Sequence, residues 1–255
     1  MIQYQQPDVN FKLEGKTFIV TGGAAGIGLA AAKFFAEKGA NCVLVDLNQS
    51  CADVAGTLGK NHMGMSGNIL DKVFRQSVID AAVKRFGRAD MLLNSAGIVA
   101  LEKAELVSEE EWDRVIGVNL TGSFRMAQTF GSYLIGAGLP GVIINMASQA
   151  GTVALDRHVA YCASKGAIIT MTKVLAFEWG KYGIRVNCVS PTVVLTELGH
   201  AAWDGPVGEA FKKEIPAGRF AEPEEIAAAV AFLCSDGASM ITGHNLIIDG
   251  GYTIK

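Results

Sequence analysis

The sequence lacks the cysteine patterns that hold metals or build disulfide frameworks. Its five cysteines are an odd number and include no C-x-x-C pair. Cys42, Cys188 and Cys234 lie in apolar stretches, where a free thiol behaves as a small hydrophobic residue. The four histidines are far apart along the chain and form no ligand pattern with the cysteines. We therefore expect no metal site and a reducing compartment.

Charge and long apolar runs are also scarce. Charged residues make up 18% of the chain, the net charge is −3, and no cluster of Lys and Arg indicates a nucleic-acid surface. No apolar run is long enough to span a membrane, and the polar N-terminal segment lacks the apolar stretch of a signal peptide. These absences predict a cytoplasmic protein that binds neither nucleic acid nor membrane.

Short apolar runs are frequent, and helix-length segments lie between them. The runs are apolar throughout rather than alternating, which is typical of strands covered on both faces. They span residues 18–22, 42–46, 62–68, 91–97, 142–148, 186–191 and 245–251. This order predicts an α/β fold, a doubly wound, seven-stranded parallel sheet with helices on both faces. No linker or repeat interrupts it, so we expect a single domain over residues 1–255.

Residues 191–220 depart from this alternation. The segment carries a short helical pattern, further prolines and Trp203. It follows the end of a strand, where α/β folds bind their ligands. We interpret it as a mobile substrate lid, with an ordinary surface insertion as the alternative.

A glycine-rich turn joins the first strand to the first helix. Gly22, Gly26 and Gly28 are spaced G-x-x-x-G-x-G within "TGGAAGIG". Gly22 suits the tight turn, Gly26 allows the backbone to approach a pyrophosphate, and Gly28 allows close packing of the helix on the strand. A strand, this turn and an amphipathic helix together predict a Rossmann fold that binds a dinucleotide.

Asp46 ends the second strand, about 20 residues beyond the glycines, where a carboxylate accepts hydrogen bonds from the ribose hydroxyls of adenosine. The same carboxylate repels a 2′-phosphate, and "VDLNQS" offers no neighbouring Arg or Lys. We therefore predict NAD rather than NADP as the cofactor. A helix or turn cap is the alternative role of Asp46.

Six ordered motifs resemble the short-chain dehydrogenase/reductase family over roughly residues 13–252. They are "TGGAAGIG" at 21–28, "NSAG" at 94–97, "VNL" at 118–120, Ser148 after "VIINMA", the pair Tyr161 and Lys165, and "RVNCVSPTVVLTEL" at 185–198. The departures are Ser95 for a second Asn, Asn68 for an Asp that contacts adenine, and Thr192 for the glycine after Pro191. We interpret Thr192 as a residue that tunes the shape of the substrate pocket.

This resemblance implies a set of functional residues. The implied catalytic residues are Asn119, Ser148, Tyr161 and Lys165. The implied cofactor-binding residues are Gly22, Gly26, Ile27, Gly28, Asp46, Asn68, Ile69, Asn94, Ala96, Gly97, Tyr161, Lys165, Pro191, Val194 and Thr196. Asn119 is implied to hold a water that links Lys165 to solvent.

The pair Tyr161 and Lys165 lies on one face of a helix, one turn apart. A free tyrosine titrates near about 10, and a neighbouring ammonium favours its phenolate. Tyr161 then acts as the base in alcohol oxidation and as the acid in ketone reduction. Ser148 positions the substrate oxygen, and Lys165 also holds the nicotinamide ribose. Taken singly, Tyr-x-x-x-Lys is usually a surface pair, and a serine after a strand is usually a helix cap.

The substrate is less clearly indicated. The segments around Ser148 and Trp203 are most similar to polyol and secondary-diol dehydrogenases of the family, which implies a small neutral alcohol or ketone. The candidate pocket residues are Gln149, Leu155, His158, Thr192 and Trp203. The alternatives are a 3-oxoacyl-thioester reductase and a non-catalytic NAD-binding regulator. The resemblance also implies a homotetramer, and residues 162–183 and the C-terminal segment with Tyr252 suit burial against a partner subunit.

Overall fold

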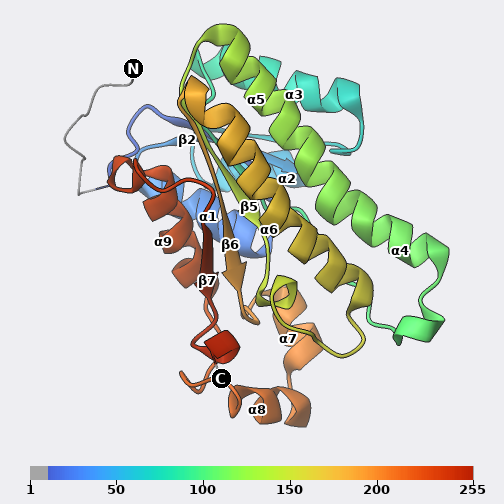
Figure 1. Cartoon of the computed structure of the whole chain (residues 1–255). Coiled ribbons are helices and arrows are strands. Elements are labelled where there is room, and N and C mark those ends of the chain that lie inside the picture. The colour runs from blue at the N-terminus through green and yellow to red at the C-terminus, as the bar shows by residue number, and fades with distance from the viewer. Residues whose placement is uncertain (1–10, 255) are drawn as a thin grey trace.

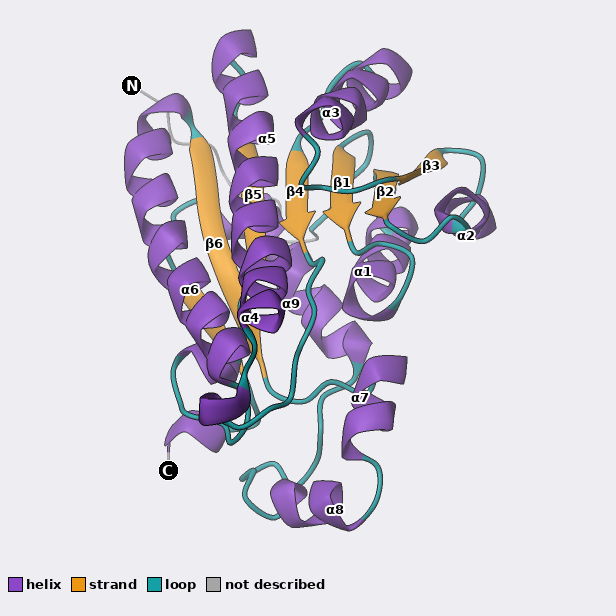
Figure 2. Ribbon diagram, turned by 90° about the vertical axis from the view of Figure 1, so that its right-hand side faces the viewer, coloured by secondary structure: helices purple, strands orange, loops and turns teal. Residues whose placement is uncertain are grey.

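A computed structural model describes residues 11–254, apart from the side chains of residues 198, 201 and 202. Residues 1–10 and 255 of the predicted domain lie outside this range. A single seven-stranded parallel sheet forms the centre, with the strand order β3-β2-β1-β4-β5-β6-β7. Its strands are β1 (Thr17–Thr21), β2 (Asn41–Asp46), β3 (His62–Ser66), β4 (Met91–Asn94), β5 (Gly141–Met146), β6 (Ile184–Pro191) and β7 (Asn245–Ile248). The predicted fold class is confirmed (Figures 1 and 2).

Helices cover both faces of the sheet. The α-helices are α1 (Gly26–Glu37), α2 (Cys51–Thr57), α3 (Lys72–Phe86), α4 (Glu109–Ile116), α5 (Ser123–Ala137), α6 (Val159–Trp179), α7 (Glu197–Trp203), α8 (Pro206–Lys212) and α9 (Pro223–Cys234). Helices α1, α2 and α9 share a core with one face, and α3, α5 and α6 share a core with the other. Strand β1 shows the reason, because Phe18 and Val20 face one core while Ile19 faces the other.

Local signals in the sequence set the ends of α3. The Asp71 side chain accepts from the backbone N–H groups of Val73 and Phe74 and so caps the first turn. Gly87 ends the helix in the left-handed conformation, at a φ of 82°. The basic residues Lys84 and Arg85 occupy the last turn, where they favour the helix dipole.

The strand order reverses between β1 and β4, which places a ligand-binding crevice beyond their carboxyl ends. Residues 95–97, 147–148 and 249–251, which the apolar pattern includes in strands, are loops instead. Figure 2 shows the strand arrows pointing toward the side of the molecule that carries α7 and α8. The candidate site therefore lies on loops at the carboxyl ends of the strands.

Candidate active site

The glycine turn has the shape that its spacing predicts. Gly22 and Gly26 adopt positive φ angles of 66° and 53°, which side chains rarely tolerate. A Cβ on Gly22 would lie 2.9 Å from the Ala96 backbone, and one on Gly28 would lie 2.1 Å from the Gly22 carbonyl oxygen. The nearest atom to a Cβ on Gly26 would be a Thr196 methyl at 3.4 Å. The turn therefore packs closely against the rest of the protein and presents backbone instead of side chains. It forms a cradle that fits a pyrophosphate.

Asp46 is held by the turn that it faces. One carboxylate oxygen accepts from the Ala24 N–H at 3.0 Å, and the other accepts from the Asn48 N–H at 3.0 Å. Each oxygen keeps a second lone pair, so the half-buried carboxylate can still accept from two ligand hydroxyls. The capping alternative is therefore compatible with ribose binding, because the backbone bonds only orient the group.

The loop after β3 forms the next part of the site. Asn68 is exposed and its side chain accepts from the Leu70 N–H at 2.9 Å. Ile69 is buried and lies against Gly122, where an added Cβ would meet its side chain at 2.8 Å. The buried Arg75 donates to the Ile69 carbonyl at 2.7 Å and so ties this loop to α3.

The end of β4 meets the glycine turn. The Thr21 hydroxyl accepts from the N–H groups of Ser95 and Ala96, each at 3.2 Å. Asn94 points into the core instead, where its amide donates to the Ser123 carbonyl at 3.1 Å and to Asn145 Oδ1 at 2.9 Å. Any contact of Asn94 with a cofactor would therefore involve its backbone or its unpartnered Oδ1.

Ser148 and Tyr161 meet beyond the end of β5. The Ser148 hydroxyl accepts from the Ala150 N–H at 3.1 Å, which caps the short turn Gln149–Gly151 and fixes its direction. The same side chain hydrogen-bonds the Tyr161 hydroxyl. Burial raises the pKa of Tyr161 above its ordinary value of 10.0, and the Ser148 bond opposes that rise.

Lys165 lies one turn after Tyr161 on α6, as their spacing predicts. Its ammonium is 5.4 Å from the centre of the Tyr161 ring and donates to the Met146 carbonyl at 2.7 Å. The residue is only 3% exposed, and burial lowers the pKa of Lys165 from 10.5 to about 8. Lys165 therefore remains largely protonated at neutral pH, at an energetic cost.

Asn119 lies in a π-helical segment, Gly117–Gly122, between α4 and α5. Its side chain accepts from the Ile98 N–H at 2.8 Å and donates to the Ile98 carbonyl at 2.9 Å and to Ser164 Oγ at 3.1 Å. An added Cβ on Gly97 would lie 3.3 Å from Asn119 Oδ1 and 3.7 Å from Lys165 Nζ. Asn119 thus clamps the loop after β4 beside Lys165, and its implied water-holding role stays a prediction.

Two of the five substrate candidates carry unsatisfied polar atoms. Gln149 is 1% exposed and Thr192 is 8% exposed, yet Gln149 Oε1 and Thr192 Oγ1 have no hydrogen-bond partner in the described chain. Both lie three residues beyond the paired residues Met146 and Val189 of the neighbouring strands β5 and β6. Since a buried acceptor without a partner costs free energy, this pair fits a site completed by a ligand hydroxyl.

The other three substrate candidates have different surroundings. His158 packs edge-on against Tyr161, with ring centres 6.1 Å apart, and its Nδ1 bonds the Asp156 carbonyl. Leu155 is half-buried in the loop between β5 and α6. Trp203 contacts Phe211 and Phe220, with ring centres 4.8 and 6.1 Å away. His158 is therefore beside the candidate catalytic tyrosine, whereas Trp203 packs within the 191–220 segment.

That segment begins against the cofactor cradle. Pro191 and Val194 are buried, and Thr196 caps α7 while its methyl lies near Gly26. Residues 193–195 pair with Ala221 through two backbone hydrogen bonds of 2.8 and 3.0 Å. These hydrogen bonds therefore join the two ends of the predicted lid where it meets the candidate site.

Sequence motifs do not identify three residues that hold parts of the candidate site in place. Thr21 binds the loop after β4, Ser164 binds Asn119, and Arg75 binds Ile69. Thr21 lies in the glycine-turn motif and Ser164 lies between Tyr161 and Lys165, but only the fold shows what each of the three residues contacts. Among the described residues, no group of three or more His, Cys, Asp or Glu side chains is arranged to hold a metal ion.

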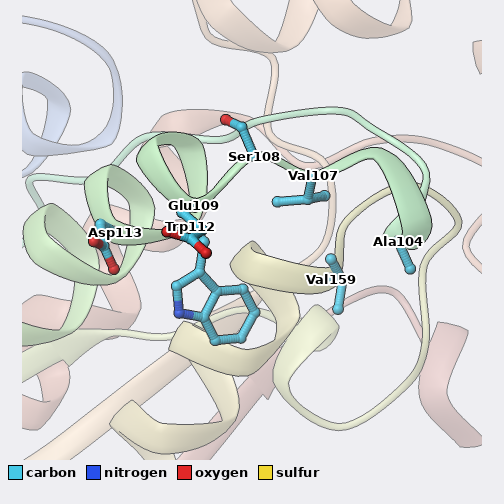
Figure 3. A pocket seen from close by; sticks show the side chains of 7 residues that line it. All are labelled: Ala104, Val107, Ser108, Glu109, Trp112, Asp113 and Val159. Atoms are coloured by element: carbon cyan, nitrogen blue, oxygen red, sulfur yellow. The ribbon is translucent and has the colours of Figure 1, made fainter.

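A surface pocket of about 330 Å³ lies apart from these residues (Figure 3). Trp112 of α4 and Val159 at the start of α6 face it, and Ala104 and Val107 border it. None of the predicted site residues lines this pocket. Within residues 11–254, no helix has both the length and the apolarity that a membrane crossing requires.

A glycine cradle, a carboxylate at the end of β2 and a serine–tyrosine–lysine group at the carboxyl ends of a parallel sheet are the parts that a Rossmann-fold oxidoreductase needs. A family model described as enoyl-(acyl carrier protein) reductase matches residues 22–253. D-threitol dehydrogenase of Mycolicibacterium smegmatis is 54% identical, over 97% of this chain and 96% of its own length. NAD-dependent glycerol dehydrogenase of Listeria innocua is 53% identical, over 97% of this chain and 98% of its own length.

Solved structures agree with the sequence comparisons. The 3-ketoacyl-(acyl-carrier-protein) reductase of Brucella melitensis, complexed with NADH, superposes with a TM-score of 0.87 at 36% identity. The match covers 95% of this chain and 100% of that one. The chain belongs to the short-chain dehydrogenase/reductase family, so the resemblance carried by the six motifs is confirmed.

Proposed function

We propose that this chain is an NAD-dependent dehydrogenase that interconverts a secondary alcohol and a ketone, with a small polyol or vicinal diol as its substrate. The buried contact between Ser148 and Tyr161, with Lys165 at 5.4 Å from the tyrosine ring, carries the proposal. The glycine cradle and Asp46 lie along the same edge of the sheet and fit NAD. Relatives that are named as threitol and glycerol dehydrogenases support the substrate class.

The chain's own residues then have defined roles. The glycine cradle and Asp46 would hold NAD, which would supply the acceptor for the hydride of the carbinol carbon. Tyr161 accepts the proton from the substrate hydroxyl during oxidation and returns it during reduction. Ser148 holds the same oxygen by a hydrogen bond, in a direction that its bond to the Ala150 N–H sets. Lys165 lowers the free energy of the Tyr161 phenolate through its charge and binds the nicotinamide ribose.

Gln149 and Thr192 are proposed to recognise the further hydroxyls of the substrate. Their buried, unpartnered oxygens would accept hydrogen bonds that a simple secondary alcohol cannot provide. A site built in this way discriminates against an analogue that lacks the hydroxyl, because the analogue leaves the buried acceptor unsatisfied. His158, Leu155 and Trp203 remain proposed pocket residues that would bound the site on the α6 and lid sides.

A substrate panel tests this function. We expect NADH to form with small polyols and vicinal diols at a higher kcat/KM than with secondary alcohols of the same chain length. Gln149→Met keeps the side-chain volume but removes the acceptor, so the preference for diols should fall about five- to one-hundredfold. Gln128→Met, on the exposed face of α5, is the matched control. An unchanged preference in Gln149→Met would exclude Gln149 from diol recognition.

Cofactor choice is proposed to depend on Asp46. In Asp46→Ala, the ratio of kcat/KM with NAD to that with NADP should fall about tenfold or more, because charge-assisted hydrogen bonds to the ribose are lost. The exposed Asp53→Ala on α2 removes a nearby carboxylate without touching the cradle and should keep the ratio. Equal ratios in the two variants would contradict the ribose contact.

Reduction of a 3-oxoacyl thioester is a second candidate, favoured by the Brucella melitensis neighbour. The predicted preference for NAD and the acceptors at Gln149 and Thr192 fit small polyols better. A third candidate, a non-catalytic regulator, conflicts with the presence of Asn119, Ser148, Tyr161 and Lys165. Absence of turnover across polyols and ketones, with NAD still bound, would favour the regulator.

A cytoplasmic homotetramer is also proposed. All five cysteines are free, which suits a reducing compartment. On α6, Phe177 is 89% exposed and Val174 is 49% exposed, and in β7 Ile247 is 40% exposed. These apolar side chains are available to pack against partner subunits. Light scattering on the purified protein measures the assembly, and a monomeric mass would contradict it.

A further inference from the structure

The C-terminal segment contacts the 191–220 lid at three separate points. The Thr192 N–H donates to the Ile248 carbonyl at 3.1 Å, near the start of the lid. The Ala217 N–H donates to the Gly250 carbonyl at 3.0 Å, near its end. Between them, the rings of Phe211 and Tyr252 stack with centres 4.9 Å apart and planes 29° apart. Figure 1 shows the chain end beside α8, in agreement with this stack.

The turn that carries Tyr252 is itself rigid. The Asp249 carboxylate accepts from the Gly251 N–H at 2.9 Å and from the Thr253 N–H and hydroxyl, both at 2.7 Å. Asp249 is only 6% exposed. A Cβ on Gly250 would lie 2.7 Å from the Ile215 side chain, so the backbone of the turn packs directly on the lid. The C-terminal turn is therefore a fixed surface, and the second half of the lid rests on it.

Helix α7 lies beyond the backbone hydrogen bonds that attach residues 192–195 to Ile248 and Ala221. Helix α7 joins α8 through Gly205, at a φ of 100°, and through the contacts of Trp203 with Phe211 and Phe220. A hollow of about 390 Å³ beside this contact is lined in part by Trp203, Val207 and Phe211. Gly205 can absorb a backbone rotation, and the hollow gives Trp203 room to move. These features suit a movement of α7 relative to α8.

We propose that Tyr252 is a positioning residue for substrate binding, because its ring, stacked on Phe211, fixes α8 as the base against which α7 closes. This inference rests on the proposed dehydrogenase function, since it assigns the lid to the same substrate site. Tyr252 acts through its ring contact with Phe211, which in turn contacts Trp203. Loss of the stack lowers the fraction of molecules whose lid can close. The apparent affinity for substrate falls in proportion to that fraction.

The test compares Tyr252→Ala with Tyr252→Phe in the full-length enzyme. Tyr252→Ala should raise the KM for the polyol about two- to tenfold, the range that an aromatic pair supplies, and keep kcat within about twofold. Tyr252→Phe retains the ring and should restore the wild-type KM. Tyr182→Ala is the matched control, because Tyr182 is 45% exposed and lies at the far end of α6.

A second readout does not depend on turnover. Trypsin cuts after lysine, and Lys213 directly follows α8 at an exposed position. With NADH present, Tyr252→Ala should be cut there several-fold faster than the wild type, since a loosened α8 opens more often. Phe211→Leu removes the same stack from the lid side and should show the same acceleration, whereas Tyr252→Phe should not.

The outcomes distinguish a failure of the proposed role of Tyr252 from a failure of the proposed dehydrogenase function. A wild-type enzyme without polyol turnover would overturn the proposed function, and the trypsin comparison would still decide the lid. Wild-type KM and wild-type cleavage in both Tyr252→Ala and Phe211→Leu would overturn the role of the stack. Failure of Tyr252→Phe to restore KM would assign the effect to the Tyr252 hydroxyl and would equally overturn it.

Discussion

Tyr161→Phe is expected to lower kcat for polyol oxidation by about 10²–10⁴-fold, the contribution of a positioned acid or base. The substitution removes one oxygen, which is buried and hydrogen-bonded to Ser148. The ring, its contact with His158 and its packing beside Lys165 remain. Because the lost atom is the proposed proton acceptor, the defect should appear in the chemical step.

NADH binding distinguishes this loss from a folding defect. The cradle at Gly22, Gly26 and Gly28 and the carboxylate of Asp46 are untouched, so fluorescence titration should give a dissociation constant close to that of the wild type. Tyr133→Phe is the matched control, because it removes a tyrosine hydroxyl that accepts from the Ala89 N–H, away from the candidate site. Substantial kcat in Tyr161→Phe would refute its role as the acid and base.

Lys165→Met is expected to lower turnover and to raise the free energy of unfolding. The ammonium is nearly fully buried, and its pKa, lowered from 10.5 to about 8, corresponds to a cost of about 3 kcal/mol for keeping it charged. Methionine has a similar shape and no charge. The variant loses the hydrogen bond to the Met146 carbonyl, worth about 1 kcal/mol. The net gain in the free energy of unfolding should therefore be about 1–3 kcal/mol at pH 7.

The pH dependence identifies the cause of that gain. Between pH 8 and 10.5 the unfolded wild type binds more protons at Lys165 than the folded form does, so wild-type stability rises with pH in this window. The advantage of Lys165→Met should thus be complete below about pH 8 and disappear by about pH 10.5. Denaturant unfolding at several pH values measures this difference.

The same variant should lose turnover by at least about 10²-fold, because no cation then favours the Tyr161 phenolate. Its remaining activity should shift to higher pH. Lys173→Met, at an exposed position on the same helix, controls for the substitution and should change neither property. A Lys165→Met enzyme that was less stable at pH 7, or fully active, would contradict the account of the buried charge.

The fold could be predicted from the sequence because both faces of each strand are covered. The run 42–46 is apolar up to its last residue, Asp46, and its pattern locates β2 to within one residue. The prediction was too long at 91–97, 142–148 and 245–251, where the apolar pattern continues past the last paired residue. Small residues such as Ala96 and Ala147 extend the pattern, but they belong to loops that form the site.

The cradle was also predictable, since its positive φ angles and close approaches require glycine. The π-helical segment around Asn119 was not, because nothing in its composition separates it from the helices on either side. Nor could the pattern show that Asn94 turns into the core, or that Trp203 packs on Phe211. Nor could the pattern show that Tyr252 stacks on Phe211 of the lid within this chain. Those placements depend on contacts between segments far apart in sequence.

The strand order has a consequence for engineering. The proposed adenosine contacts, from Gly22 to Ile69, come from the β1–β3 half of the sheet, and the proposed substrate contacts, from Gln149 to Trp203, come from the β5–β7 half. Thr196 of the second half lies near Gly26 of the first half, which makes this contact a seam between the two sets. Substitutions away from that seam should be additive, so cofactor and substrate preference can be redesigned as independent modules.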